Sequence, residues 1–407
     1  MKNIYILLQI PGNRNPMLGM FLDILKSQTN ISIIVLSPDE IEGKLKDVEY
    51  ISNSKIVILA NRFFYLLVRV FEKAINFIFN RNNAEIRPSF FSGIYFFISH
   101  TIISVFQFLK LLFKKKGVIV CIDAGGLTPA RWINIVKKMP VAYAIYEIYP
   151  NQFKIGKCFY RYLQGIERRG IKIADVLFSP INEIVGKLVL RRYKLSGKRL
   201  VSVSVCPTEQ TEKSATDVKY PVSLYYHGIF AEGRGLDELI LAMKHIQPEK
   251  AHLYLRGFGD MKTQLELLIK KNDLATKITI LEPLPSEELS KAAANFDVGL
   301  TMAQLDVVNH RFACGFKTLD NINAGMALMV PDGFVLNKLV TDNNIGFVYK
   351  DGVENHLTEC IHQIIENTDV IPQMKKNSTE LASTYLNRSK QAEIFWKEIE
   401  ILLNNVN

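Results

Sequence analysis

The sequence has little cysteine or tryptophan: its 407 residues include five of the former and two of the latter. The cysteines are odd in number and widely spaced, so they offer neither a disulfide framework nor a CxxC metal site, and a reducing compartment is expected. No GxxxxGK[ST] segment occurs, which excludes a P-loop site. With only 23 glycines and 15 prolines, the composition also excludes a fibrous or disordered chain.

Apolar residues make up 48% of the chain, which is enough for more than one domain core. Charge differs between the halves. Residues 1–200 contain 30 basic and 13 acidic side chains, a net charge of +17, whereas residues 201–407 contain 20 and 27, a net charge of −7. A basic half indicates an anionic partner, either a membrane surface or nucleic acid. Because no RNA motif or recognition-helix signature is present, we expect no nucleic acid partner.

An apolar stretch over residues 89–113 is long enough to span a bilayer, and Lys114, Lys115 and Lys116 follow it. It also contains several serines and Gln107, and the preceding segment 63–80 is amphipathic. A spanning helix, core helices and a membrane-docking surface are therefore all open. The basic half favours docking, because each lysine or arginine near an anionic leaflet adds about 1 kcal/mol to binding. The first apolar run, 4–9, is too short for a signal peptide and predicts a strand.

Strands alternate with helices along both halves of the chain. Apolar runs such as GVIVCID and VAYAIYE are typical of parallel sheets with both faces covered. The sequence predicts an α/β protein with two facing, doubly wound, Rossmann-like domains and an apolar helical insertion in the first. We expect the first domain over 1–205, a linker over 206–222, the second domain over 223–388, and a C-terminal helix over 389–407 that packs back on the first domain.

Two loops of the second domain contain glycines directly after predicted strands, where ligands bind in such sheets. In the loop HGIFAEGRG, 227–235, Gly228 and Gly233 let the backbone approach a ligand closely, and Arg234 adds a positive charge. Such a loop can hold a phosphate. A strand-to-helix turn with a solvated arginine is the alternative. The loop around Gly257 and Gly259 matches only half of GxGxxG, so a dinucleotide site is not expected.

A third loop, RFACGFKTLDNINAG, places Lys317 and Asp320 on one face of a predicted helix that follows Gly315. A cation and a carboxylate at this spacing can bind the diphosphate and the ribose hydroxyls of a nucleotide sugar. An ion pair between neighbouring residues on the helix surface is the alternative.

Together, the order and spacing of these loops resemble the nucleotide-binding domain of GT-B glycosyltransferases, in particular the retaining family 4 group and its KxxE-type variant. The matching positions are the segment 228–235, Gly257, Gly259, Glu288, Leu289, Asp297, Val298, Lys317, Asp320, Gly325 and Val330. In the first half, CIDAGGLTPA, YEIYPNQF, Glu167 and Asp175 are similar to further family segments. Three positions depart from the pattern: Phe312 replaces a glutamate, Tyr146 a histidine and Ala327 a proline.

The resemblance implies transfer of a sugar from a nucleotide-sugar donor, with no metal and no cofactor. It implies a leaving diphosphate stabilised by cations and, in retaining members, a donor phosphate that accepts the acceptor's proton. The implied catalytic residues are Arg234, Lys317, Asp123 and Glu147. The implied donor-binding residues are Gly228, Gly233, Gly257, Gly259, Glu282, Gly315 and Asp320, and the acceptor-side residues are Gly12, Arg14 and Tyr146. Two alternatives remain: Asp123 as a structural cap, and the PGNRNP segment around Gly12 as a plain turn.

The expected protein is thus a cytoplasmic glycosyltransferase, peripheral on the membrane, that builds a surface polysaccharide or a lipid-linked oligosaccharide. Its expected partners are the nucleotide sugar, a lipid-linked or glycan acceptor and an anionic membrane surface. Two other functions remain open. The departures at Phe312 and Tyr146 allow a GT-B-like protein that binds a nucleotide sugar or glycan without turnover, and a sugar-nucleotide epimerase shares the same fold.

Overall fold

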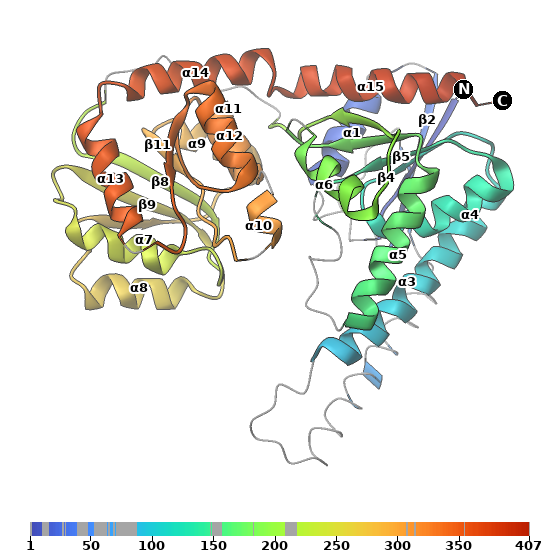
Figure 1. Cartoon of the computed structure of the whole chain (residues 1–407), viewed down its shortest axis with the longest axis horizontal. Coiled ribbons are helices and arrows are strands. Elements are labelled where there is room, and N and C mark those ends of the chain that lie inside the picture. The colour runs from blue at the N-terminus through green and yellow to red at the C-terminus, as the bar shows by residue number, and fades with distance from the viewer. Residues whose placement is uncertain are drawn as a thin grey trace. The chain divides into compact units, whose positions relative to one another are not determined.

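The computed structural model describes residues 2–9, 16–26, 28, 30–38, 48–52, 63, 66, 67, 70, 88–146, 148, 157–181, 183–207, 218–306, 308–312, 315–353 and 355–406. The chain forms two compact units, one of residues 1–203 with 392–407 and the other of residues 204–391. Each unit is built on one parallel sheet with helices packed on it (Figure 1). The prediction of two Rossmann-like α/β domains is therefore confirmed.

The sheet of the first unit has the strand order β3-β2-β1-β4-β5-β6-β7, and its paired strands are parallel. The strands are β1 (Lys2–Leu7), β2 (Ile31–Ser37), β3 (Val48–Ser52), β4 (Val118–Cys121), β5 (Val141–Ala144), β6 (Val176–Ser179) and β7 (Arg199–Ser202). The central strands are short apolar runs because helices cover both faces of the sheet. The apolar run at 56–60, whose pattern predicts a further strand, lies outside the described residues, and β3 was not predicted.

The described helices of this unit are α1 (Pro16–Lys26), α3 (Pro88–Leu112), α4 (Leu127–Lys137), α5 (Lys157–Ile173), α6 (Ile184–Tyr193) and most of α15 (Arg388–Asn404). The C-terminal helix α15 belongs here through its packing. The ring of Phe395 stacks on Phe21 of α1 at 4.2 Å between centroids and lies 4.8 Å from Phe178 of β6. Glu398 forms an ion pair with Arg199 of β7. The last 16 residues of the chain thus complete the first unit.

The sheet of the second unit has the order β10-β9-β8-β11-β12-β13, and all of its pairs are parallel. Its strands are β8 (Val222–Ile229), β9 (Ala251–Phe258), β10 (Ile278–Leu281), β11 (Val298–Leu300), β12 (Ala327–Pro331) and β13 (Gly346–Tyr349). Its described helices are α7 (Leu236–Ala242), α8 (Lys262–Lys271), α9 (Ser286–Ala293), α10 (Val308–Phe312), α11 (Phe316–Asn323), α12 (Phe334–Asn343), α13 (His356–Glu366) and α14 (Ile371–Thr384). Residues 208–217 of the predicted linker lie outside the described residues.

The long helix α3 buries its polar side chains. His100, Ser104 and Gln107 lie on one face and are buried against the carboxyl ends of β1 and β2. Gln107 Nε2 donates hydrogen bonds to the carbonyl of Leu8 at 2.8 Å and to that of Leu36 at 3.3 Å. Burial lowers the pKa of His100 to about 4, so this imidazole is neutral. The polar residues of the apolar stretch therefore hold the helix on the sheet.

The opposite side of α3 exposes apolar side chains. Phe97, Val105, Leu109 and, just beyond the helix, Phe113 are 45%, 41%, 49% and 86% exposed. Four-residue steps join Phe97 through Thr101 to Phe113, and since each step turns about 40° around the helix, these side chains form one winding stripe, the α3 stripe. Within the described residues, Gly93–Leu112 is long and apolar enough to cross a membrane, a test that core helices of soluble proteins also pass, and 28% of its apolar window is buried.

The buried carboxyl of Glu167 on α5 makes the first unit sensitive to pH. It accepts hydrogen bonds from the hydroxyls of Tyr143 and Tyr193, and burial raises its pKa to about 7 from a usual 4.5. Between these two values the unfolded chain has released the proton and the folded chain has kept it, so stability falls as pH rises. From pH 5 to 8 this one group should cost about 3 kcal/mol.

Glu167→Gln should remove this contribution. We expect the melting temperature of the variant to fall less between pH 5 and pH 8 than that of the wild type. Glu49→Gln, which changes a half-exposed carboxylate of β3, is the control and should keep the wild-type pH dependence. Identical pH profiles for Glu167→Gln and wild type would contradict the assignment.

Candidate functional site

The candidate site lies where the strand order of the second sheet reverses. From β8 the chain adds β9 and β10 on one side and then returns to place β11 on the other side of β8. The loops that follow the carboxyl ends of β8 and β11 flank this point, and open α/β sheets bind ligands in the crevice between such loops. The loop 230–235 and the first turn of α11 border this point.

Lys317, in the first turn of α11, points to the end of β8. Its ammonium Nζ donates a hydrogen bond to the hydroxyl of Tyr226 at 2.9 Å and lies 4.6 Å from the centre of that ring. Burial, together with the nearby charge of Arg234, lowers the pKa of Lys317 to about 7. Burial raises the pKa of Tyr226 to about 12, so its hydroxyl keeps its proton and donates it to the carbonyl of Ile229 at 3.1 Å.

Gly228 makes room for this lysine. A Cβ atom at position 228 would lie 2.6 Å from Lys317 Nζ and 2.5 Å from its Cε, and the backbone has a φ of +138°. The conformation therefore requires glycine, and a Cβ would also displace the end of the Lys317 side chain. The sequence predicted that Gly228 lets a ligand approach the backbone, and the structure shows that it admits the side chain of Lys317.

Arg234 is held in the loop between β8 and α7 by two glycines in the left-handed region, Gly233 with a φ of +78° and Gly235 with a φ of +64°. The carbonyl of Gly233 accepts a hydrogen bond at 3.0 Å from the backbone N–H of Gln304, which follows β11. The loops on the two sides of the strand reversal are thus joined. Arg234 and Lys317 are close enough to interact electrostatically, so two positive charges converge at the crevice.

Asp320 lies one turn after Lys317 on α11. Its Oδ2 is 3.3 Å from Nε2 of His227, which is buried near the end of β8, while the Asp320 side chain is 20% exposed. Lys317 contacts Tyr226 and Asp320 contacts His227, and no ion pair joins Lys317 to Asp320 among the described residues. The sequence left open an ion pair between these two residues, and the structure separates them.

Three other predicted donor residues have structural contacts. A Cβ at Gly257 would lie 1.9 Å from the carbonyl oxygen of Gly228, and one at Gly259 would lie 2.3 Å from that of Phe230. Gly257 therefore allows close pairing at the ends of β8 and β9, and Gly259 allows the segments that follow these strands to pack backbone to backbone. The side chain of Glu282, after β10, is 85% exposed and pairs with Lys262 at 3.6 Å. Since β9 separates β10 from β8, Glu282 is remote from Lys317 along the sheet.

Gly315 immediately precedes α11, and a Cβ there would meet nothing within 4 Å. The start of α11 is fixed to the sheet by Thr318, whose hydroxyl lies 2.9 Å from that of Thr301 after β11, with both groups buried. The space beside Gly315 is therefore open, whereas the helix that carries Lys317 and Asp320 is held in place.

In the first unit, Asp123 follows β4 at the corresponding strand reversal between β1 and β4. Its Oδ2 accepts the backbone N–H of Gln9 at 2.8 Å and its Oδ1 accepts that of Gly126 at 3.1 Å. Of the two roles considered from the sequence, this geometry favours the structural cap. Tyr146 donates its hydroxyl to the carbonyl of Val203 at 3.0 Å. Gly12, Arg14 and Glu147 lie outside the described residues.

Tyr226 and His227 were not predicted as site residues. The apolar pattern places Tyr226 in a buried strand, His227 is the first residue of the glycine-rich loop 227–235, and neither belongs to the motifs of the resemblance. A polar aromatic pair at the end of an otherwise apolar strand was the available signal. It becomes informative only once α11 is known to lie against that strand end.

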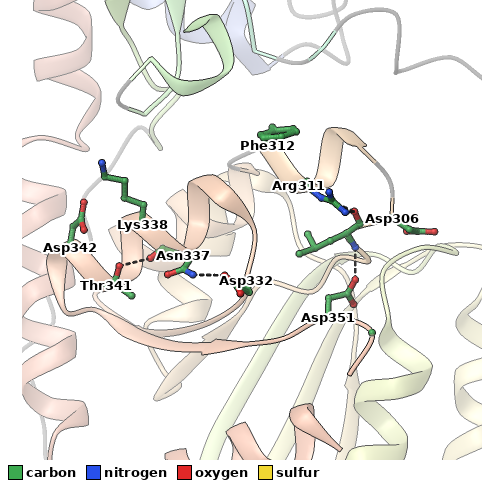
Figure 2. A pocket seen from close by; sticks show the side chains of 11 residues that line it. Asp306, Arg311, Phe312, Asp332, Asn337, Lys338, Thr341, Asp342 and Asp351 are labelled. Atoms are coloured by element: carbon green, nitrogen blue, oxygen red, sulfur yellow. Dashed lines mark hydrogen bonds between the residues drawn. The ribbon is translucent and has the colours of Figure 1, made fainter. Parts of the chain in front are cut away.

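A cavity of about 840 Å³ opens near the carboxyl ends of β11, β12 and β13 (Figure 2). Phe312 and Arg311 of α10 line it, together with Asp332, Asn337 and Asp351, among others. The carboxylate of Asp351 accepts the backbone N–H of Leu305 at 2.6 Å, and a dashed line marks this bond beside Asp351 in Figure 2. No predicted donor-binding residue lines this cavity, but Phe312, the position of the missing glutamate, does. Among the described residues, no group of three His, Cys, Asp or Glu side chains could hold a metal ion.

Comparisons with known proteins agree with this geometry. Residues 208–381 match the family model described as glycosyl transferases group 1. A search of curated proteins finds no match to the chain. Among solved structures, HepE from Anabaena in complex with UDP is 12% identical with a TM-score of 0.69, covering 98% of this chain and 100% of that one. Sucrose-phosphate synthase from Thermosynechococcus elongatus is also 12% identical, with a TM-score of 0.65 and full coverage of both chains.

WaaG, a glycosyltransferase involved in lipopolysaccharide biosynthesis, is 14% identical with a TM-score of 0.63, covering 98% of this chain and 99% of that one. At these identities the structural likenesses show the fold. The chain therefore has the GT-B fold expected from its sequence, contains a glycosyl transferases group 1 domain in its second unit, and is a transferase.

Proposed function

We propose that the protein is a retaining transferase of the family 4 group, in its KxxE-type variant. It moves a sugar from a nucleoside diphosphate to a lipid-linked glycan acceptor in surface polysaccharide synthesis. Like the resemblance, HepE supports this donor class, because its structure was solved in complex with UDP. The observation that carries the proposal is the convergence of Lys317 and Arg234 at the strand reversal. Positive charges fixed there stabilise the diphosphate as it leaves.

The two cations also supply the positive charge that a divalent metal supplies in other transferases, so we propose transfer without a metal or a cofactor. Asp320, partly exposed beside them, is the carboxylate that accepts hydrogen bonds from the ribose hydroxyls. The glycines at positions 233 and 315 border the same crevice and leave the backbone accessible to the donor.

Incubation of the purified protein with radiolabelled UDP-, GDP-, ADP- and CMP-sugars, with and without lipid-linked acceptors, tests this function. We expect one donor to be consumed, with release of its nucleotide, and the activity to persist in EDTA. A thermal-shift screen of the same donors identifies the base, since a ligand at 100 times its dissociation constant stabilises by about 2.7 kcal/mol. Binding without turnover would instead favour the non-catalytic alternative that Phe312 leaves open.

We further propose that the first unit docks peripherally on the anionic cytoplasmic face of the membrane through the α3 stripe. Lys115 and Lys116, two and three residues after Phe113, are exposed, and α4 adds exposed Ile135 and Val136. Lys137 holds these elements together, since its ammonium donates to the carbonyls of Leu111 at 3.3 Å and Leu112 at 3.2 Å, at the end of α3. Apolar side chains next to lysines complement an anionic leaflet. Such a surface suits a lipid-linked acceptor.

Donor binding should depend on pH through Lys317. Because the pKa of Lys317 is about 7 in the donor-free protein, a growing fraction of the amine is uncharged above that pH, whereas a diphosphate binds the ammonium form. We expect the dissociation constant of the nucleoside diphosphate to rise about tenfold per pH unit above pH 7.5, measured by calorimetry. In Lys317→Met the dissociation constant should be higher and nearly independent of pH. A flat profile in the wild type would contradict diphosphate binding by this amine.

A further inference from the structure

His227 is an unusual residue for its position. It lies near the end of β8, it is 2% exposed, and its ring is packed 5.6 Å from that of Tyr225. Its Nδ1 is buried and has no hydrogen-bond partner among the described residues. A buried polar atom without a partner is costly, so packing alone would favour an apolar side chain here. The ring nitrogen that does have a partner, Nε2, is the one that faces Asp320.

The contact between His227 and Asp320 has a defined direction. A carboxylate only accepts hydrogen bonds, so the hydrogen is carried by Nε2, which donates to Oδ2 at 3.3 Å. The ring is enclosed by the protein, whereas Asp320 is partly exposed. Oδ2 thus accepts a hydrogen bond from a buried donor, and Oδ1 can accept one from a ligand.

The strand geometry explains why Lys317 and Asp320 do not neutralise each other. Successive side chains of a strand project to opposite faces of the sheet. Tyr226 and His227 therefore keep their partners on α11 apart. Tyr226 holds Lys317, and His227 holds Asp320. Two adjacent residues of β8 therefore determine where the ammonium of Lys317 and the carboxylate of Asp320 lie.

From this we infer that His227 is a positioning residue that orients Asp320 for the two hydroxyls of the donor ribose. The inference rests on the proposed function, because it presumes that a nucleoside diphosphate binds at this crevice. His227 itself does not touch the ligand. It therefore contributes only to the recognition of groups that bind Asp320, and not to the diphosphate or to the chemical step.

Nucleotides with and without ribose hydroxyls distinguish this role from a general effect on packing. Calorimetry would measure the binding of UDP, GDP and ADP, and of the 2′,3′-dideoxy form of each, to the full chain. For the nucleotide that binds best, we expect the wild type to prefer the ribose form about tenfold or more, the usual effect of losing a hydrogen bond to a charged group. His227→Leu, which removes the N–H at similar volume, should reduce this preference to about twofold or less.

Further variants and a rate measurement complete the test. His227→Gln, which restores an N–H donor, should recover most of the preference, and kcat at saturating donor should stay within about twofold in both variants. His227→Leu combined with Asp320→Ala should bind no more weakly than Asp320→Ala alone, because the two residues act as one unit. His252→Leu is the matched control, since His252 on β9 contacts Thr279 at 2.8 Å, away from α11, and this variant should behave as wild type.

Each contrary result has a distinct meaning. If His227→Leu weakens the ribose and dideoxy forms equally, or changes neither, the positioning role is overturned while the proposed function stands. If the wild type binds none of the three nucleoside diphosphates, the proposed function is overturned and the inference with it.

Discussion

Lys317→Met and Arg234→Ala should each lower turnover by about 100-fold or more, because both cations stabilise negative charge that grows as the diphosphate leaves. Methionine fills the buried volume of Lys317 without its charge. It also leaves Tyr226 satisfied, since that hydroxyl still donates to the carbonyl of Ile229. Initial rates with the identified donor at saturating concentration measure the effect, and melting temperatures check the fold.

The two variants should differ in their pH dependence. In Arg234→Ala, the lysine loses the neighbouring charge that helps to lower its pKa, so the loss of donor binding at high pH should begin at a higher pH than in the wild type. Lys270→Ala, which removes an exposed cation at the end of α8, is the control and should retain full activity. Full turnover in both Lys317→Met and Arg234→Ala would remove the basis of the proposed function.

Charge reversal at the end of α3 should release the protein from anionic membranes. Lys115→Glu with Lys116→Glu changes two exposed side chains and leaves Lys114 in its 2.6 Å ion pair with Glu49. Each reversal should cost about 2 kcal/mol at low ionic strength, so the double variant should partition several-hundred-fold less. Leu109→Ser with Phe113→Ser should weaken binding because less apolar surface is buried in the membrane. The effect on the fold should be small because both side chains are exposed.

Flotation with anionic and with neutral vesicles, at low and high salt, measures the partitioning. The wild type should float with anionic vesicles at low salt and less at high salt. Leu267→Ser, at an exposed position of the second unit, is the control and should float as the wild type does. Failure of the wild type to float with either vesicle would refute docking. Retention of the chain in native membranes after carbonate washing would favour a spanning helix instead.

The sequence predicted the fold better than the site because the two depend on different interactions. Strands such as β4 and β6 are short apolar runs wherever a parallel sheet is covered on both faces, so local pattern identifies them. The strand β3 was missed because Val48–Ser52 at the sheet edge is mixed in polarity. The site instead depends on which side chains of β8 and α11 meet, and they are about 90 residues apart in the chain.

The apolar helix shows the same limit. Its composition allowed a spanning helix, a core helix or a docking helix, because hydropathy does not say which face of a helix is buried. In the structure His100, Ser104 and Gln107 turn inward to meet backbone carbonyls and Gln9, and the apolar stripe is left outside. Only the position of the helix over the strand ends, where the carbonyls of Leu8 and Leu36 accept hydrogen bonds from Gln107, makes the polar face the buried one.

By itself, the sequence determined the α/β class and the two-domain organisation. It also determined that Arg234, Lys317 and Asp320 lie beside turns that follow strands. These features depend on short-range sequence pattern and on the direction of parallel strands. The tertiary structure decided how those residues are used. It placed Lys317 on Tyr226 and in the space left by Gly228, and Asp320 on His227, because the reversal of strand order brings α11 against the end of β8.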